Sequence, residues 1–421
     1  NKGRIQGPWE KGEFDTTAIA GKNLYASIDV ELQQLGEKLM QNKVGSIVAI
    51  DPKTGGILCM VSAPSYNPNY LTGNQRKKHL VDMMYYDPRK PLLNRTVSTT
   101  YSPGSTFKTL VGIIGMAEGV IDDQTTVSCG GSYLGCGRKM GCHEVGTFTL
   151  QPAISKSCNS YFAVVFRKIL DNAKVNNRDI TLGLFNEYAY SFGLGKKLGV
   201  DLPSERNGNI PTAGYYQKIF GKNWQACNII SNSIGQGEIT TTLTQLANVM
   251  AIIANKGWYY LPHLIDSIEG GDDYETLARF KVKQRTKNIA ESVFEEVHAG
   301  MQGTMEFGTG AAAKIPGINV CGKTGTVENA YRGESLKDHA FFGAFAPREN
   351  PRIAIAVMCE NAGYGATSAV PIASLLIEKY LKGTIADADR KAKIEQLANM
   401  DLIPPQMKRL MIKQVPSNSQ R

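Results

Sequence analysis

No apolar run in this sequence approaches the roughly 18 residues that a helix needs to cross a bilayer. The apolar stretches, such as 111–116 and 246–254, are interrupted and have the length of buried helices. The chain begins at Asn1 and carries no signal peptide. We therefore expect a piece of a longer protein, so the missing span does not argue against an anchor elsewhere.

The sequence also lacks a basic stripe with interleaved aromatic residues. The net charge is +9, but the basic residues are scattered and form only short clusters such as Arg76-Lys77-Lys78. This pattern argues against nucleic-acid binding. Weak attraction to an anionic membrane or wall polymer explains the charge equally well.

Cysteine is neither absent nor abundant, and no Cys-x-x-Cys pair occurs among the eight cysteines. Cys129, Cys136 and Cys142 cluster, and His143 follows directly. The cluster indicates a structural zinc site or a disulfide, with three ordinary thiols in a glycine-rich loop as the alternative. Four others lie in apolar surroundings, and we expect them to be small core residues: Cys59, Cys227, Cys321 and Cys359.

With 421 residues, 42% hydrophobic and 20% charged, the chain fits one large or two ordinary globular domains. Residues 1–22 are polar, and we interpret them as a linker or the remnant of a preceding domain. Residues 23–383 form the main domain. The charged tail 384–421 contains one short amphipathic piece.

Apolar patterns predict a helix from Asn23, capped by Asp29, and then a hairpin of strands 44–51 and 57–61. A mainly helical region covers roughly 75–310, where a helix that begins at Ser105 is apolar around most of its circumference. The remaining predicted elements are helices at 150–165, 242–255 and 369–382, and strands at 318–327, 339–346 and 353–360.

These elements predict an α+β fold. One five-stranded antiparallel sheet is flanked by the terminal helices, and the middle of the chain forms a mainly helical lobe. The cleft between the sheet and the helical lobe is the natural place for a functional site.

Three short motifs follow one another along the chain: Ser105-Thr106-Phe107-Lys108, Ser157-Cys158-Asn159 and Lys323-Thr324-Gly325-Thr326. A nucleophile, basic partners and a substrate-binding strand are the parts needed to attack a carbonyl through an acyl-enzyme. Each motif alone is ordinary, because Ser-x-Asn is usually a turn or a cap and Lys-Thr-Gly a strand end. Their order and their surroundings favour catalysis.

Lys108 lies one helical turn after Ser105, so its amine can reach the Ser105 hydroxyl. To act as a base near neutral pH, its pKa must fall about three units from about 10.4. Burial and the positive charge of Lys323 would lower it. Ser157 can relay a proton, and Asn159 can fix Lys108 and a substrate amide.

The backbone N–H groups of Ser105 and Thr326 are the candidate oxyanion hole. The hydroxyls of Thr324 and Thr326 can hold a substrate carboxylate. Gly325 has no side chain to block an extended peptide that adds to the strand. Gln236 can line the cleft, and a purely structural loop is the alternative there.

Longer segments around these motifs resemble the class B penicillin-binding proteins, whose motif trio is a known signature. They are 48–55, 62–69, 101–108 and 338–347, and the resemblance covers about 23–383. Segments 233–238 and 360–365 are most similar to penicillin-binding protein 2, the cell-elongation branch. The cysteine cluster resembles a cysteine-containing insert of elongation enzymes. This resemblance does not imply a metal site.

This resemblance implies a D,D-transpeptidase whose serine, Ser105, attacks the D-Ala-D-Ala amide of a peptidoglycan stem peptide and passes the acyl group to a neighbouring strand. It implies inhibition by β-lactam antibiotics and no required cofactor. The implied partners are a SEDS-family glycosyltransferase and membrane proteins of the elongation complex. The implied location is the periplasmic face of the inner membrane, with an N-terminal anchoring helix absent from this chain.

Three alternatives remain. A serine β-lactamase or a D,D-carboxypeptidase would share the fold and the nucleophile. A β-lactamase needs a base for deacylation, and no convincing Glu-x-x-x-Asn element follows Ser157. A non-catalytic β-lactam sensor or scaffold would keep the fold, and Ser105→Ala distinguishes it from an enzyme.

Overall fold

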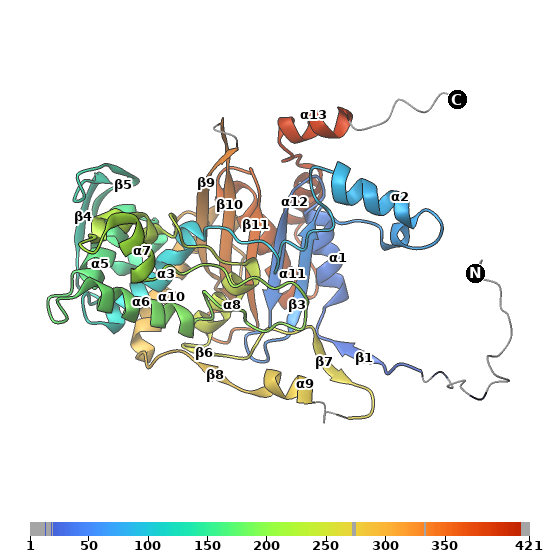
Figure 1. Ribbon diagram of the computed structural model, residues 1–421, viewed down its shortest axis with the longest axis horizontal. Coiled ribbons are helices and arrows are strands. Elements are labelled where there is room, and N and C mark those ends of the chain that lie inside the picture. The colour runs from blue at the N-terminus through green and yellow to red at the C-terminus, as the bar shows by residue number, and fades with distance from the viewer. Residues whose placement is uncertain (1–12, 14–17, 19, 272–274, 332–333, 414–421) are drawn as a thin grey trace.

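Five strands form one antiparallel sheet through the middle of the protein, in the order β3-β2-β11-β10-β9 (Figure 1). The computed structural model describes residues 13, 18, 20–271, 275–331 and 334–413. The strands are β2 (Gly45–Ile50), β3 (Ile57–Ala63), β9 (Cys321–Tyr331), β10 (Glu334–Ala346) and β11 (Ile353–Cys359). The predicted α+β fold with a five-stranded antiparallel sheet is thereby confirmed.

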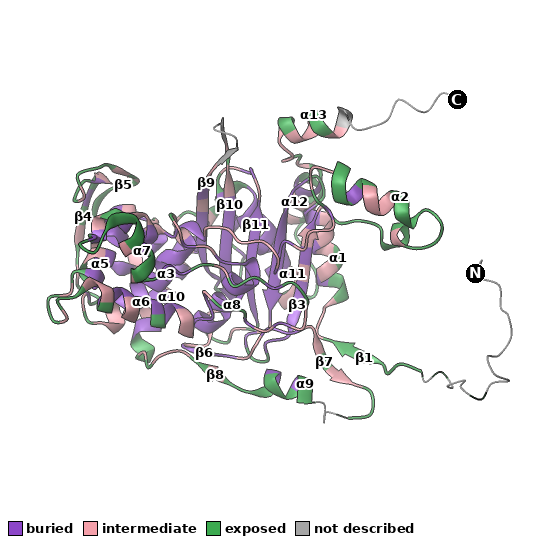
Figure 2. Ribbon diagram, in the orientation of Figure 1, coloured by how far each residue is buried: buried purple, intermediate pink, exposed green. Residues whose placement is uncertain are grey.

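Both faces of the sheet are covered, so its central strands are almost entirely apolar. Every residue of β2 and β11 is buried, and most of the sheet is buried in Figure 2. Alternate residues of β2 point to opposite faces. Ile47 and Ala49 belong to one hydrophobic core, and Val48 and Ile50 belong to the other.

Helices from both ends of the main domain cover one face, and α8 covers the other. The covering helices are α1 (Val30–Leu39), α8 (Leu243–Ala254) and α11 (Ala369–Lys382). The predicted helices at 242–255 and 369–382 are confirmed with close bounds. Thr242 caps α8 through a reciprocal side-chain bond with Gln245.

The helical lobe packs beside α8 and the edge strand β9 (Figure 1). It comprises the 3₁₀ turns η4 (Gly104–Phe107) and η5 (Ala226–Ile234), α3 (Lys108–Ala117), α4 (Leu150–Ser155), α5 (Asn159–Leu170), α6 (Arg178–Ser191), α7 (Ala213–Phe220), α10 (Glu291–Glu306), β4 (Val127–Tyr133) and β5 (Met140–Phe148).

Smaller elements lie at the periphery. They are β1 (Leu24–Ala26), β6 (Trp258–Tyr259), β7 (Ile265–Ile268), β8 (Gln284–Arg285), α2 (Arg76–Val81), α9 (Glu275–Ala278), α12 (Ala388–Asn399), α13 (Pro405–Lys413), the 3₁₀ turns η2 (Pro68–Leu71), η6 (Arg279–Lys281), η7 (Ala311–Ala313) and η8 (Gly365–Thr367), and the π-helical turn η3 (Asp82–Tyr86).

The predicted helix from Asn23 starts too early. Residues 24–26 are extended and pair with β7, a strand more than 230 residues later that no local pattern indicates. The helix begins at Val30 because the Asp29 carboxylate accepts the N–H of Leu32, which makes Asp29 the N-cap. The predicted cap is therefore correct.

The helix predicted at 150–165 is two helices. α4 ends at Ser155 and α5 begins at Asn159, with Ser157 between them at φ +61°. A left-handed conformation at a non-glycine residue cannot continue a helix. The sequence prediction missed this break because the apolar spacing continues across it.

The tail forms more structure than one amphipathic piece. α12 packs on α1, and its Leu397 is fully buried in the core of the sheet. The buried Lys43 amine donates to the Leu397 carbonyl and so caps the end of α12. In the described part of the chain, none of the helices combines the length and the apolar character that a membrane crossing requires.

Candidate active site

Ser105 lies in the turn η4, immediately before the buried helix α3. From Pro103 to Gly115 every residue is buried except Ser105, which is half-buried. The Pro103-Gly104 pair produces this geometry, since Gly104 has φ +57°, which favours glycine. The hydroxyl of Ser105 is therefore the reachable side chain on an otherwise closed segment.

Two neighbouring segments hold the turn of Ser105. The N–H of Gly104 donates to the carbonyl of Gly235 at 2.8 Å. A Cβ at Gly104 would lie 2.9 Å from the Thr326 carbonyl oxygen. The glycine thus lets the turn approach β9 closely, and it brings Ser105 beside the third motif.

Lys108 is fully buried, and its amine meets the second motif. The amine lies 2.8 Å from the Ser157 carbonyl oxygen, 3.1 Å from the Ser157 hydroxyl and 2.5 Å from Asn159 Oδ1. Desolvation lowers the pKa of Lys108 to about 7. A pKa near neutrality is what a base at this position requires.

Two details differ from the prediction for Lys108. Burial is the main cause of the lowered pKa, and the nearby Cys142 and Cys158 oppose it. Among the residues that the structure describes, no hydrogen bond joins the Ser105 hydroxyl to the amine, which is engaged by Ser157 and Asn159. Catalytic hydrogen bonds commonly form only when the substrate is bound.

The hairpin of β4 and β5 supports Asn159. Its side-chain amide donates to the Gly141 carbonyl at 2.7 Å, and its N–H donates to Cys142 Sγ at 3.2 Å. The left-handed Ser157 turns the chain so that its carbonyl and hydroxyl both face Lys108. The second motif is therefore a turn held from β5.

Lys323 and Thr324 lie on the edge strand β9. The Lys323 side chain is fully buried, and its amine donates to the Thr324 carbonyl at 3.1 Å. Desolvation first, and then repulsion by Lys108, lower the pKa of Lys323 well below its usual value. The repulsion indicates that the first and third motifs share one electrostatic environment. The charge of Lys323, which was predicted to lower the pKa of Lys108, is not among the causes of that shift, since burial lowers that pKa.

Gly325 has a packing role in addition to the substrate-binding role predicted for it, which stays a prediction. A Cβ there would lie 3.2 Å from Thr106 Cγ2 and 3.3 Å from the Pro103 carbonyl oxygen. The missing side chain therefore makes room for the turn of Ser105. A Cβ at Gly365 would in turn lie 2.9 Å from the Gly325 carbonyl, so two glycines allow close packing here.

Gln236 lies next to a residue that contacts the turn of Ser105. It is half-buried and follows Gly235, whose carbonyl accepts from Gly104. Its own N–H donates to the Ser231 carbonyl. The oxyanion and substrate-binding roles of this region stay predictions, as do the catalytic roles. These predictions concern Ser105, Lys108, Ser157, Asn159, Gln236, Lys323, Thr324, Gly325 and Thr326.

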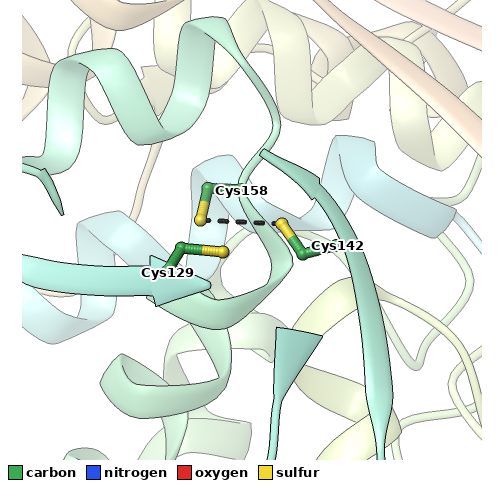
Figure 3. A group of neighbouring side chains, drawn as sticks. All are labelled: Cys129, Cys142 and Cys158. Carbon is green, nitrogen blue, oxygen red and sulfur yellow. Dashed lines mark hydrogen bonds between the residues drawn. The ribbon is translucent and has the colours of Figure 1, made fainter. Parts of the chain in front are cut away.

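The cysteine cluster has different members from those predicted. Cys136 forms a disulfide with Cys227, so Cys227 is not a core residue and Cys136 is not a free thiol. Cys158, from the second motif, joins Cys129 and Cys142 instead (Figure 3). His143 is exposed and lies outside this group, because neighbouring residues on β5 point to opposite sides.

The three thiols can hold a metal ion. Their sulfur atoms lie within 4.8 Å of one another, and 3.8 Å separates Cys142 Sγ from Cys158 Sγ. The pKa of Cys142 lies below its usual value, first because of its hydrogen bond with the Cys158 thiol. Three thiolates are a donor set typical of structural zinc sites, which take a fourth ligand.

Thr309 was not singled out from the sequence, although the structure brings it to the third motif. It follows α10, is exposed, and its hydroxyl lies 2.7 Å from that of Thr324. No local pattern marks this residue. Cys158 could have been found, because a cysteine inside the second motif was visible in the sequence.

Residues 45–378 match the family described as penicillin binding protein transpeptidase domain. This range covers most of the chain and contains all three motifs. The chain belongs to this family.

Similar proteins agree with this assignment. The chain is 33% identical to the peptidoglycan D,D-transpeptidase MrdA of Acinetobacter baumannii over 83% of its own length and 52% of that protein, so it spans about half of it. A solved structure of Pseudomonas aeruginosa PBP2 in complex with WCK 5153 is 30% identical, with a TM-score of 0.75 over 88% of this chain and 77% of that chain.

A complex of Helicobacter pylori PBP2 with MreC is 25% identical, with a TM-score of 0.73 over 86% of this chain and 64% of that chain. The resemblance seen in the sequence is confirmed by these matches. They include proteins named PBP2, the family member that segments 233–238 and 360–365 indicated.

Proposed function

We propose that this domain is a peptidoglycan D,D-transpeptidase that acts in cell-wall elongation. Ser105 attacks the carbonyl of the D-Ala-D-Ala amide, releases D-Ala, and transfers the acyl group to an amine on a neighbouring strand. One observation carries the proposal. Lys108 is a fully buried amine with a pKa near 7, one turn from a reachable serine.

The neutral amine of Lys108 takes the proton of Ser105 as its oxygen attacks. The amine then returns a proton, directly or through Ser157, to the nitrogen of the departing D-Ala. The contacts of Lys108 with Ser157 and Asn159 support this route. In the second half, the acceptor amine loses its proton along the same path and attacks the acyl-enzyme.

Transition-state charge collects on the carbonyl oxygen. The N–H groups of Ser105 and Thr326 are the donors we propose for it, each worth about 3–4 kcal/mol. The approach of Gly104 to the Thr326 carbonyl supports their proximity. Thr324 and Thr326 hydroxyls hold the terminal carboxylate of the substrate near the Lys323 amine, and Gln236 lines the opposite wall.

β-Lactams are expected to acylate the same serine, as the family name implies. The test is intact-protein mass spectrometry after incubation with benzylpenicillin. One covalent adduct per chain on the unaltered protein, located at Ser105 and absent from Ser105→Ala, supports the proposal. An adduct on another side chain, or an adduct on Ser105→Ala, overturns it.

The competing readings give different outcomes. A β-lactamase or a carboxypeptidase hydrolyses its acyl-enzyme, so a chromogenic cephalosporin would be consumed over many turnovers. A transpeptidase gives one stoichiometric burst. A non-catalytic sensor keeps function in a Ser105→Ala complementation test, whereas the enzyme loses it.

We further propose that the domain works at the periplasmic face of the inner membrane, held by an N-terminal helix outside this chain. The Cys136–Cys227 disulfide supports an oxidising compartment. The similar Helicobacter protein in complex with MreC supports MreC as an elongation partner, and the family resemblance supports a SEDS-family glycosyltransferase. The test is cross-linking in membranes. If neither MreC nor the glycosyltransferase is recovered with this protein, the result contradicts these partners.

A further inference from the structure

A covalent bond joins the two segments that hold the catalytic groups. Cys136 lies in the turn between β4 and β5, and its sulfur is bonded to Cys227, 91 residues later in η5. The proposed mechanism uses neither residue. Each of them, however, lies in a segment that contacts one of the proposed catalytic residues or the turn that holds it.

The first path runs along the hairpin β4–β5. Five residues after Cys136, the Gly141 carbonyl accepts the side-chain amide of Asn159. Cys142 Sγ accepts the Asn159 N–H. Since Asn159 Oδ1 lies 2.5 Å from the Lys108 amine, the position of the hairpin determines the position of the proposed base.

The second path runs along segment 226–237, which contains η5 and the loop after it. Cys227 is its second residue, and the Gly235 carbonyl near its end accepts the N–H of Gly104. A Cβ at Gly235 would lie 2.2 Å from the Gly104 carbonyl oxygen, so the two backbones are packed directly on each other. The position of this segment determines the position of Ser105.

Packing between the two segments is incomplete. A cavity of about 480 Å³ is lined by Cys136 and Arg138 of the hairpin turn, and by Cys227, Ser231 and Gly237 of segment 226–237. Within this solvent-open cavity, side chains of the two segments are separated, and the Cys136–Cys227 bond is a covalent link between them at its wall. The disulfide crosses this poorly packed boundary.

We propose that Cys136 and Cys227 are positioning residues for acylation, because their bond fixes the support of Lys108 relative to the support of Ser105. This proposal rests on the catalytic function proposed above for Lys108 and Ser105. When the disulfide is open, the hairpin and segment 226–237 shift independently. A displacement of about 1 Å between reacting groups lowers a rate by up to about a hundredfold.

The first test compares Cys136→Ser/Cys227→Ser with Cys59→Ala, a variant that removes a buried sulfur between α1 and the sheet, far from the site. Saturation kinetics with a fluorescent penicillin separate the acylation rate constant from the non-covalent binding constant. We expect the double variant to lose about tenfold to a hundredfold in the rate constant, with little change in binding. Cys59→Ala should keep the acylation rate constant of the unaltered protein, even if its melting temperature falls as much as that of the double variant.

A second measurement uses the unaltered protein, in case the double variant does not fold. Dithiothreitol reduces the disulfide to two thiols and is itself oxidised to its cyclic disulfide. Circular dichroism checks that the fold persists. The same loss of acylation rate supports the proposal if it is reversed after the reductant is removed and oxidised glutathione, itself reduced to two glutathione thiols, restores the disulfide.

The outcomes separate this proposal from the function it rests on. An equal acylation rate at Ser105 in both redox states overturns the positioning role and leaves the transpeptidase proposal standing. If Cys59→Ala shows the same loss of acylation rate, the disulfide acts only through general stability. This result also overturns the positioning role. Labelling that persists in Ser105→Ala overturns the proposed function itself.

Discussion

The sheet and the helical lobe supply the site in different ways. Lys323 and Thr324 lie on a strand whose ladder to β10 is unbroken from Cys321 to Val327. Ser105 lies in the turn η4 and Asn159 is the first residue of α5, and both sites are held by a few individual hydrogen bonds from distant segments. A dense regular support resists small changes, whereas a sparse support transmits them to the groups it holds. The comparison therefore predicts that changes in the helical lobe alter rate and changes in the sheet core alter stability.

The largest effect on rate is expected from Lys108→Met. Methionine fills a similar volume without the amine, so the buried helix α3 should still fold. Loss of the general base should lower the acylation rate constant about 10³- to 10⁴-fold. Stopped-flow labelling with a fluorescent penicillin measures this. A folded Lys108→Met protein that is acylated at the normal rate would show that the helical lobe does not supply the general base.

The next effect is the pH dependence of acylation. Burial lowers the pKa of Lys108 to about 7, and the neutral amine is the active form. The rate should therefore be constant above about pH 8, halve near pH 7 and fall about tenfold per pH unit below that. Measurements from pH 5 to 9 check the sign. A profile that is flat, or that rises toward acid, contradicts a neutral Lys108.

The sheet was predictable from the sequence because its signals are local. Strands 45–50 and 57–63 are short apolar runs separated by a Pro-Lys-Thr-Gly-Gly turn, and α11 ends at Gly383 in the left-handed conformation. Two-sided burial then determines how these pieces pack. The exceptions, β1 and α12, depend on partners far along the chain, β7 and α1.

The helical lobe was predictable in its motifs and not in its geometry. Residue types and order identified Ser105, Lys108 and Asn159. The left-handed conformation of Ser157 and the disulfide of Cys136 depend on which distant segments meet. The periodicity of apolar residues in the sequence carries no information about such contacts. Cys158 was visible in the second motif, but its position beside Cys129 and Cys142, in place of Cys136, also depends on which segments meet.

A third prediction concerns the thiol cluster, which lies directly behind the second motif. If the donor set is a zinc site, protein purified without chelator should contain about one zinc per chain. Cys158→Ser should lose the metal and about tenfold in acylation rate, because Cys142 also accepts the Asn159 N–H. Elemental mass spectrometry measures the content, with Cys321→Ser, a buried thiol outside the cluster, as the control. Equal metal content in both variants would be evidence against the site.

A smaller effect is expected where the helical lobe meets β9. Thr309→Val removes the hydroxyl that lies 2.7 Å from Thr324 while keeping the side-chain shape. One lost hydrogen bond of about 1 kcal/mol corresponds to roughly a fivefold weaker interaction with the substrate carboxylate. Acylation kinetics should place the loss in binding, and Thr309→Ser should behave as the unaltered protein. An equal loss in Thr309→Ser would assign the effect to packing.

The smallest effect on rate is expected from the sheet core. Ile355 on β11 is fully buried among residues of α11 and β10, on the face away from the helical lobe. Ile355→Ala should lower the free energy of unfolding by about 2–5 kcal/mol through lost burial and a cavity. Urea denaturation measures this loss, and the acylation rate of the folded protein should stay within about twofold. If instead the rate falls with the stability, the sheet core and the site are one cooperative unit and the contrast between the two regions does not hold.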